Sequence, residues 1–370
     1  MTRPTCLAAA LLAALAVDAG AAGFALIEQN ASGLGNAYAG AAAVAQDAST
    51  IYFNPAGMVH LPDRQLVLAG HLIKPTMEFS GTAVITPPSP AAGTPVSGGM
   101  GGDAGDWALV PNFYYAFRLS PAVHLGLGIN APFGLNLQRI EAELTNRQPL
   151  GLLPAAPDTL VKIKGDDYSW GYNLGLLWQV SPATRIGLSY RSEVEHTLKG
   201  KASSNPNVLG GPVKAGITLP DSASLSFFHR LSPRWDLLAD VTWTGWSDFD
   251  RLAIVGAVNK TTPENWDDIL RYSLGATWHM NGKLSLRGGV AHDEAVVSDR
   301  FRTPRIPDGA RTWLAIGGQY RLSRQSALDF GYAHLFVNDP KLDIVDNQTR
   351  LSGTYNAAVD ILSVQYTHGF

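Results

Sequence analysis

GFALIEQNASGLGNAYAGAAAVAQDASTIYFNPAG, residues 23–57, is the stretch that decides the fold of this chain. It is rich in Gly, Ala and Ser, and it has too few bulky apolar residues to build a core of its own. Ordering such a segment costs conformational entropy that it cannot recover alone. We therefore expect the rest of the chain to surround it, so that it becomes a plug.

The first 21 residues have the pattern of a secretory signal peptide. Arg3 supplies the positive charge, residues 7–17 form an apolar run of mostly Ala and Leu, and small residues follow at a suitable cleavage site. An ordinary amino-terminal helix is the alternative interpretation. Cys6, the single cysteine, lies in this segment, so the mature chain is expected to have no disulfide and no cysteine-bound metal.

The composition is low in charge for a chain of this length. Of 370 residues, 46% are hydrophobic and 16% are charged, whereas a soluble domain has about 25% charged residues. The net charge of −3 and the absence of a basic run predict no nucleic-acid partner. After the amino terminus, no apolar run approaches the roughly 18 residues of a membrane helix. Low charge without such a helix is typical of a transmembrane β-barrel.

Apolar and polar residues alternate over most of the chain. Ile186, Leu188 and Tyr190, for example, alternate with charged or polar neighbours, which places one face of a strand in an apolar medium. Many segments exceed the roughly 9–11 residues of a membrane strand. We predict an all-β, transmembrane antiparallel β-barrel over residues 63–370, with residues 22–62 as a hatch that plugs the lumen. Twelve strands are visible, near residues 65–85, 106–119, 122–137, 166–180, 183–200, 214–231, 234–256, 268–280, 282–298, 310–322, 326–346 and 352–370.

The connections alternate in length. Pairs such as Ser120-Pro121 and Asn281-Gly282 mark tight turns, and longer loops lie between them, above all at 86–105 and 138–165. Short turns at one end and long loops at the other are the pattern of outer-membrane barrels, with the turns facing the periplasm. The last strand ends on Phe370, and a terminal aromatic residue resembles the signal that the barrel-assembly machinery recognises.

Several motifs resemble the FadL family of outer-membrane transporters of long-chain fatty acids and other hydrophobic compounds. In the plug these are Gly33-Leu34-Gly35, Ala37-Tyr38, Gln46-Asp47-Ala48 and Asn54-Pro55-Ala56-Gly57. Further matches are Val110-Pro111-Asn112, residues 190–194 and 240–246, and TPRIPDGARTWLAIGGQY at 303–320. The resemblance implies a monomer without a cofactor in the outer membrane of a Gram-negative bacterium. It also implies that cargo binds near the hatch and leaves sideways into outer-membrane lipid.

One departure from the family pattern concerns strand number. The family resembles fourteen-stranded barrels, and the missing pair would fall between Leu137 and Asp166. Residues 139–152 are expected to form a short amphipathic helix or a disordered loop. Losing a hairpin keeps the strand number even, so the barrel can still close, at a smaller diameter.

The candidate gate is Asn54-Pro55-Ala56, supported by Gly33 and Gly35. Proline has no backbone N–H, so a regular element stops there; a simple turn into the barrel is the alternative. The resemblance also implies that Phe24, Leu26 and Ile27, at the start of the plug, line an apolar ligand pocket, where burying apolar surface is worth about 25 cal/mol per Å². A fatty-acid carboxylate needs a cation, and the candidates are Arg302, Arg305 and Arg311. Solvated loop charge is the alternative for each arginine.

Other function classes have weaker support in the sequence. No HExxH, Gly-rich phosphate loop or paired metal-ligand spacing occurs, so neither an enzyme nor a metal site is expected. A general or substrate-selective porin for polar solutes is the main alternative, because a barrel without a plug is a water-filled pore.

Overall fold

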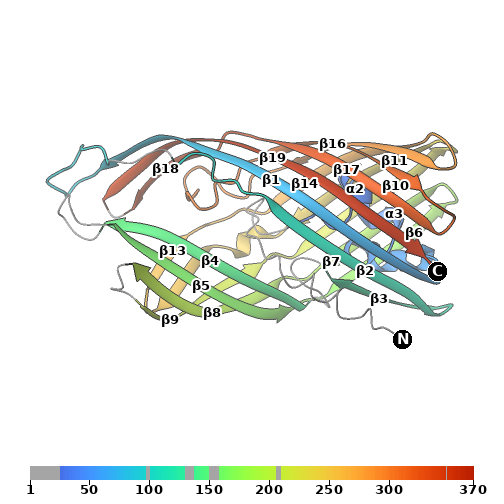
Figure 1. The fold of residues 1–370 in the computed structure, drawn as a ribbon, viewed down its shortest axis with the longest axis horizontal. Helices are drawn as coiled ribbons and strands as arrows, with labels where there is room; N and C mark the ends of the chain where they lie inside the picture. The colour runs from blue at the N-terminus through green and yellow to red at the C-terminus, as the bar shows by residue number, and fades with distance from the viewer. Residues whose placement is uncertain (1–25, 97–100, 130–136, 150–157, 206–209, 347) are drawn as a thin grey trace, which may run out of the picture.

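The computed structural model describes residues 26–96, 101–129, 137–149, 158–205, 210–346 and 348–370, with 137–149 and 158–161 described by their backbone (Figure 1). No helix within these ranges is long and apolar enough to cross a membrane.

Long antiparallel strands make up most of the structure. Their bounds are β1 Arg64–Ile85, β2 Ala108–Ser120, β3 Val123–Ile129, β4 Leu137–Pro149, β5 Asp158–Trp170, β6 Asn173–Ser181, β7 Thr184–Arg191, β8 Val194–Asn205, β9 Gly210–Leu219, β10 Ser222–Ser232, β11 Trp235–Thr244, β12 Arg251–Gly256, β13 Lys260–Pro263, β14 Ile269–His279, β15 Leu284–Asp293, β16 Arg311–Arg321, β17 Ser326–Val337, β18 Lys341–Asp346 and β19 Thr349–Gly369.

The strands form one barrel wall. At the end of the wall with the short turns, here called the turn end, the strands follow the order β3-β2-β1-β19-β17-β16-β15-β14-β11-β10-β7-β6. The opposite end is called the loop end, and β18 also pairs with β19. The loop end of the same wall continues in the order β13-β12-β9-β8-β5-β4. The second sheet lies at the end of the cylinder away from the carboxyl terminus, and β1, β18 and β19 of the first sheet also reach that end (Figure 1). Among the described residues, twelve strands stand side by side in the turn-end order, the number that alternation made visible in the sequence.

The segment between Leu137 and Asp166 departs from our expectation. The predicted helix or disordered loop at 139–152 is wrong for residues 139–149, because β4 and β5 pair there in unbroken register, with Glu143 opposite Lys164. The sequence of β4 lacks clean alternation and contains good helix formers. Pairing with β5 nevertheless gives its backbone groups partners, and tertiary context routinely overrides local propensity. The segment lengthens the wall instead of adding a hairpin.

The outer face of the barrel is apolar, and many of its inward side chains are polar. On β14, the inward side chains of Arg271, Ser273 and Thr277 are buried, whereas the outward Tyr272 and Leu274 are 44% and 61% exposed. Many outward side chains on the other strands are equally large and apolar, and near the turns Trp235 stacks on Trp278 with ring centroids 5.9 Å apart. Outward apolar residues flanked by aromatic residues are characteristic of a lipid-facing surface.

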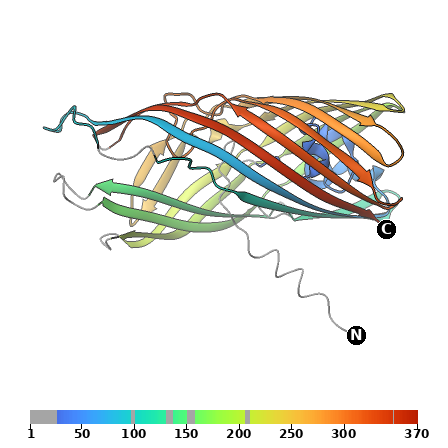
Figure 2. The same ribbon diagram turned by 45° about the horizontal axis from the view of Figure 1, so that its top comes forward.

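The hatch lies inside the turn end of the barrel (Figure 2). It contains α2 (Ala31–Leu34), α3 (Ala41–Val44), α4 (Thr50–Phe53) and the 3-10 helix η1 (Pro55–His60). The α2 helix packs against β1, β16, β17 and β19, and α3 packs against β6, β7 and β10 on the other side. Strands on both sides of the bore therefore hold this small-residue segment, which has no core of its own.

Candidate functional site

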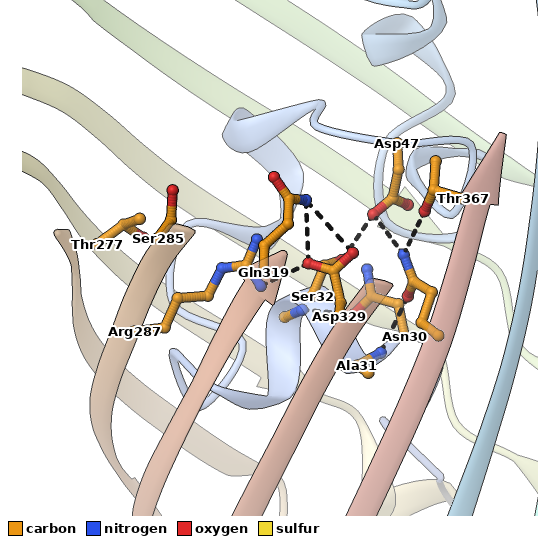
Figure 3. A network of polar contacts seen from close by, with 12 residues as sticks. Asn30, Ala31, Ser32, Asp47, Thr277, Ser285, Arg287, Gln319, Asp329 and Thr367 are labelled. Atoms are coloured by element: carbon orange, nitrogen blue, oxygen red, sulfur yellow. Dashed lines mark hydrogen bonds and ion pairs between the residues drawn. The ribbon is translucent and has the colours of Figure 1, made fainter. Parts of the chain in front are cut away.

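A network of polar contacts fixes the start of the hatch to the wall (Figure 3). The backbone N–H of Ala31 donates to Gln365 Oε1 at 3.0 Å, and Gln365 Nε2 donates to Asp47 Oδ2 at 3.0 Å. Ser32 Oγ donates to the same carboxylate at 2.6 Å. Asp47, expected only as part of a hatch motif, therefore joins two parts of the hatch to β19.

A buried ion pair lies beside this network, within the wall itself. Arg287 Nη1 on β15 donates to Asp329 Oδ1 on β17 at 2.6 Å, and Gln319 Nε2 on β16 donates to the same oxygen at 3.0 Å. Both charged side chains are almost completely buried. Figure 3 shows these side chains reaching across neighbouring strands next to α2. Together with Gln319, the ion pair links β15, β16 and β17 beside the hatch.

Glycines of the wall let the hatch backbone approach closely. A Cβ built on Gly289 would lie 2.2 Å from the carbonyl carbon of Asn36, and one on Gly187 would lie 2.0 Å from the carbonyl oxygen of Ala42. At Gly35 of the hatch, a Cβ would lie 2.9 Å from the Cα of Gly317. Only glycine fits at contacts of this kind. At these three contacts, the backbone of the hatch therefore packs directly against the backbone of the wall.

Near the hatch, the ladder of the wall is interrupted at a seam. In the described part of the chain, β3 and β6 stand at the two ends of the turn-end order, and no pairing joins them. Farther from the turns, β4 and β5 do pair. Along the chain, β4 follows β3 and β5 precedes β6. The helices α4 and η1 of the hatch lie against this seam, since α4 packs on β3 and η1 packs on both β3 and β6.

Asn54 occupies the seam. Its Nδ2 donates to the carbonyl of Leu176 on β6 at 3.0 Å and to the carbonyl of Ala42 in the hatch at 2.7 Å. In return, Asn173 Nδ2 on β6 donates to the carbonyl of Ile51 at 3.0 Å. Side-chain amides thus bond to backbone carbonyls of β6 and of the hatch at a strand edge that has no neighbouring strand.

Of the predicted gate residues, Asn54, Pro55 and Ala56 lie at this place, whereas Gly33 and Gly35 do not. Pro55 begins η1, and Asn54 Oδ1 accepts from the backbone N–H of Ala56 at 3.1 Å, which caps that helix. A Cβ on Gly175 of β6 would lie 1.9 Å from Asn54 Oδ1. Gly33 lies farther along the hatch, under the Asn30 side chain that caps α2. The alternative interpretation, a simple turn into the barrel, also fits this backbone, but here the turn is hydrogen-bonded to the edge of β6.

An apolar cluster lies deeper in the bore. It is buried between α2 and the wall, and Leu26 and Ile27, two of the predicted ligand contacts, pack against it while only partly buried. Phe24 lies outside the described residues. The cluster consists of Leu34, Ala37, Tyr38, Ile73, Ala108, Val110, Ala291, Trp313, Ala315, Ala333, Leu335, Val359 and Ile361; we call it the lumen cluster.

Charged side chains stand in one cross-strand row at the loop side of this cluster. The register places Arg271 of β14 opposite Asp293 of β15, and Asp293 opposite Arg311 of β16. Arg271 Nε lies 2.9 Å from Asp293 Oδ1, Arg311 Nε lies 3.8 Å from Asp293 Oδ2, and Trp313 Nε1 donates to Asp293 Oδ2 at 2.8 Å. Among the described residues, neither arginine Nε has a partner in hydrogen-bond geometry. The row therefore offers buried guanidinium N–H groups beside apolar side chains.

Glu28 of the hatch lies close to this row. Burial raises the pKa of its carboxyl to about 7, against the opposing influence of its own backbone hydrogen bond and of Arg271 and Arg311. The Asp293 carboxylate, which lies between the two arginines, shows that the site accommodates a carboxyl group.

The three predicted arginines differ in their surroundings. Arg302 is buried and bonded within its own loop, to Asp299, to the carbonyls of Asp308 and Val297, and to that of Lys341. Arg305 is exposed. Arg311 is buried in the cross-strand row and also bonds Asp308. The structure thus brings only Arg311 of the three to the lumen cluster.

Sequence reasoning missed several residues of the site. Arg271, Asp293 and Asn173 were not selected, although each is a polar residue at an inward position of an alternating strand, which is the signal that could have found them. Across the described ranges, no group of three or more His, Cys, Asp or Glu side chains is arranged to hold a metal ion.

Comparisons with known proteins agree with this architecture. The chain matches the model of the family described as "Outer membrane protein transport protein (OMPP1/FadL/TodX)" over residues 12–148 and 134–370. It is 27% identical to the long-chain fatty acid transport protein of Salmonella typhi, covering 90% of this chain and 92% of that one.

Two solved structures resemble the fold over almost all of both chains. A FadL homologue of Pseudomonas aeruginosa aligns with a TM-score of 0.81 at 22% identity, covering 94% of this chain and all (100%) of that one. The toluene transporter TodX of Pseudomonas putida aligns with a TM-score of 0.62 at 15% identity, covering 94% and 99%. The chain is therefore an outer-membrane β-barrel that belongs to the OMPP1/FadL/TodX family of outer membrane transport proteins.

Proposed function

We propose that this chain carries out passive uptake of long-chain fatty acids or other hydrophobic compounds across the outer membrane. Cargo binds at the lumen cluster beside the hatch and leaves sideways through the seam between β3 and β6 into membrane lipid. The observation that carries the proposal is the seam, an interruption of the wall closed by Asn54 of the hatch. The related fatty acid transporter and the toluene transporter support the cargo class.

We infer that the hatch blocks a route straight through the bore. A cavity inside it, lined by Tyr38, Asp47 and Phe53 among others, has a volume of about 30 Å³, which is room for little more than one water molecule. A hydrophobic molecule also gains nothing from entering the periplasm, whereas it keeps its apolar contacts if it moves into lipid. The porin alternative needs an open bore and has no support in the fold or the comparisons.

The experiment measures uptake of labelled oleate and toluene by cells with the chain, without it, and with Asn54-Pro55-Ala56 deleted. We expect both uptake rates to depend on the chain and to change on deletion of the gate. Equal uptake in all three strains would refute the transporter. A matched variant, Gln179→Ala, changes another β6 amide that bonds only in its turn and should leave uptake unchanged.

We further propose that the cross-strand row recognises a carboxylate. The Arg311→Gln variant should lose roughly 10- to 150-fold in oleate affinity, since a charge-assisted hydrogen bond contributes about 1.5–3 kcal/mol, with toluene uptake within about twofold of wild type. Arg305→Gln, on the exposed arginine, is the control. Arg311→Lys keeps the charge and should recover part of the affinity. If oleate and toluene lose equally, Arg311 supports the fold and not the head group.

The termini have roles outside the transport cycle. Residues 1–21 are proposed to be removed on export. Phe370, which is 61% exposed and anchored by its backbone to the carbonyl of Arg64 at 3.0 Å, is proposed to be read by the barrel-assembly machinery. The protein is proposed to work as a monomer, without a cofactor and without enzymatic activity. Deleting Phe370 should lower the amount of assembled barrel without changing the melting temperature of what assembles.

A further inference from the structure

The loop end of the barrel carries a cluster of lysines on its outer face. Lys199 and Lys201 lie on β8 and Lys214 lies on β9, all with exposed side chains. The register sets Lys199 directly opposite Lys214, and Lys201 is two residues farther along the same face. We call these three residues the outer lysine patch. Figure 1 shows β8 and β9 at the end of the barrel away from the carboxyl terminus.

This arrangement is unfavourable for the isolated protein. Like charges that face each other directly across paired strands repel. Within the described ranges, no carboxylate lies within ion-pair distance of any of the three lysines, although Asp166 stands opposite Lys199 in the β5–β8 register. On the outer face of β8 itself, the acidic residue is Glu195, four residues before Lys199.

Other cations at the same end of the barrel are neutralised. Lys74 is paired with Asp103 at 3.0 Å, Lys260 with Asp346 at 2.8 Å, and Arg350 with Asp343 at 2.6 Å. The neighbouring strand β5 adds Lys162 and Lys164, and β4 sets Glu143 opposite Lys164. The excess of positive charge is thus centred on β8 and β9.

The height of the patch relative to the membrane identifies what it faces. Trp170 on β5 is 72% exposed and Tyr168 is 62% exposed, so these residues mark the outer aromatic belt. Lys199 and Lys201 pair with Asp166 and Lys164, four and six residues beyond Trp170. A tilted strand rises roughly 2.5 Å per residue along the barrel axis, so the patch lies about 10–15 Å above the belt. That is the level of lipid head groups.

We propose that the outer lysine patch binds the phosphorylated head group of the glycolipid in the outer leaflet, with the acyl chains of the same lipid against Trp170 and Tyr168. Each lysine near an anionic membrane surface strengthens attraction to the lipid, and three convergent ammonium groups match a multiply charged phosphate head group. The bound lipid would supply the counter-charges that the protein lacks at this place.

The test titrates the full-length protein in detergent with rough lipopolysaccharide and counts bound lipid by native mass spectrometry. The K199E/K201E/K214E variant should bind at least roughly tenfold more weakly. Wild-type protein should lose as much affinity when the lipopolysaccharide is dephosphorylated. A control variant, R234E/K283E/R324E, makes the same change of charge at three exposed cations of the periplasmic turns and should bind as wild type does.

Four outcomes would overturn the proposal: unchanged binding by the patch variant, an equal loss in the turn variant, equal binding of the dephosphorylated lipid, or full displacement by about 10 mM inorganic phosphate. The last result would mean a small-anion site without lipid contacts. Should the glutamate variant fail to assemble, K199Q/K201Q/K214Q removes the charges without reversing them and should show an intermediate loss. Oleate uptake should stay unchanged in every variant, which separates this site from the transport route.

Discussion

The contact between Gly289 of β15 and the hatch offers a sharp test of how the plug is held. A Cβ at Gly289 would lie 2.2 Å from the carbonyl carbon of Asn36, 2.4 Å from its oxygen and 2.7 Å from the nitrogen of Ala37. Its neighbour Gly288 points outward, and a Cβ there would meet no atom within 4 Å. Gly289→Ala and Gly288→Ala thus make the same chemical change on opposite faces of one strand.

The expected cost follows from the contacts that must yield. Normal contact distance requires the hatch to move by about 1 Å, because the clash is with backbone and not with a flexible side chain. Such a movement strains two hydrogen bonds, Asn36 Nδ2 to Thr277 Oγ1 at 3.1 Å and Arg271 Nη2 to the carbonyl of Ala37 at 2.8 Å. Overpacking costs about 1–3 kcal/mol and a charge-assisted hydrogen bond is worth about 1.5–3 kcal/mol. We expect the seated hatch to lose about 2–3 kcal/mol, or roughly 30- to 150-fold in its equilibrium.

The assay is liposome swelling with small sugars, together with limited proteolysis of the hatch. Gly289→Ala should raise sugar permeability and expose the hatch to cleavage, whereas Gly288→Ala should match wild type in both measurements. The reasoning fails if the two variants behave alike. It also fails if Gly289→Ala melts the whole barrel without first loosening the hatch, since the strain is local to the plug.

Three further predictions concern buried charges and the seam. Burial raises the pKa of Glu28 from 4.5 to about 7, so the contribution of this group to hatch stability is fully present below pH 4.5 and is lost as pH rises to 7, by up to about 3 kcal/mol. Glu28→Gln should remove this pH dependence, which is measured as hydrogen-exchange protection of hatch amides at pH 5 and pH 8. An unchanged dependence in the variant would contradict this reasoning. Arg287→Met leaves the Asp329 carboxylate buried without its cation and should cost about 3–5 kcal/mol, whereas the R287M/D329L double variant should recover most of the melting temperature; equal melting of both variants would mean that the pair is not coupled. Asn54→Ala removes the hydrogen bonds of its side chain to Leu176, Ala42 and Ala56. At about 1 kcal/mol per lost hydrogen bond it should speed hydrogen exchange of hatch amides by roughly 100-fold, and Gln179→Ala at the turn end of the same strand serves as its control.

The seam and the hatch also explain why strand counting alone was insufficient. Alternation made twelve strands visible in the sequence and left twelve or fourteen open, and it suggested a short helix or a loop where β4 and β5 pair. That pairing joins the two stretches of chain again beyond the interruption between β3 and β6, which lies near the hatch. The position of the opening therefore depends on where β3 and β6 separate while β4 and β5 stay paired. The sequence of neither strand shows this by itself.

What the sequence determined by itself is the period-two pattern and the unusual plug. Alternation such as Arg271, Tyr272, Ser273 and Leu274 depends only on neighbours along the chain, so it specifies strand, face and lipid exposure before any folding is considered. The Gly- and Ala-rich run at 23–57 likewise shows that the hatch cannot stand alone. Only the tertiary structure could place Arg311 beside Asp293 and Arg271, or Asn54 on Leu176. Those contacts join residues far apart in sequence, and the register of a closed sheet is set by all of its strands together.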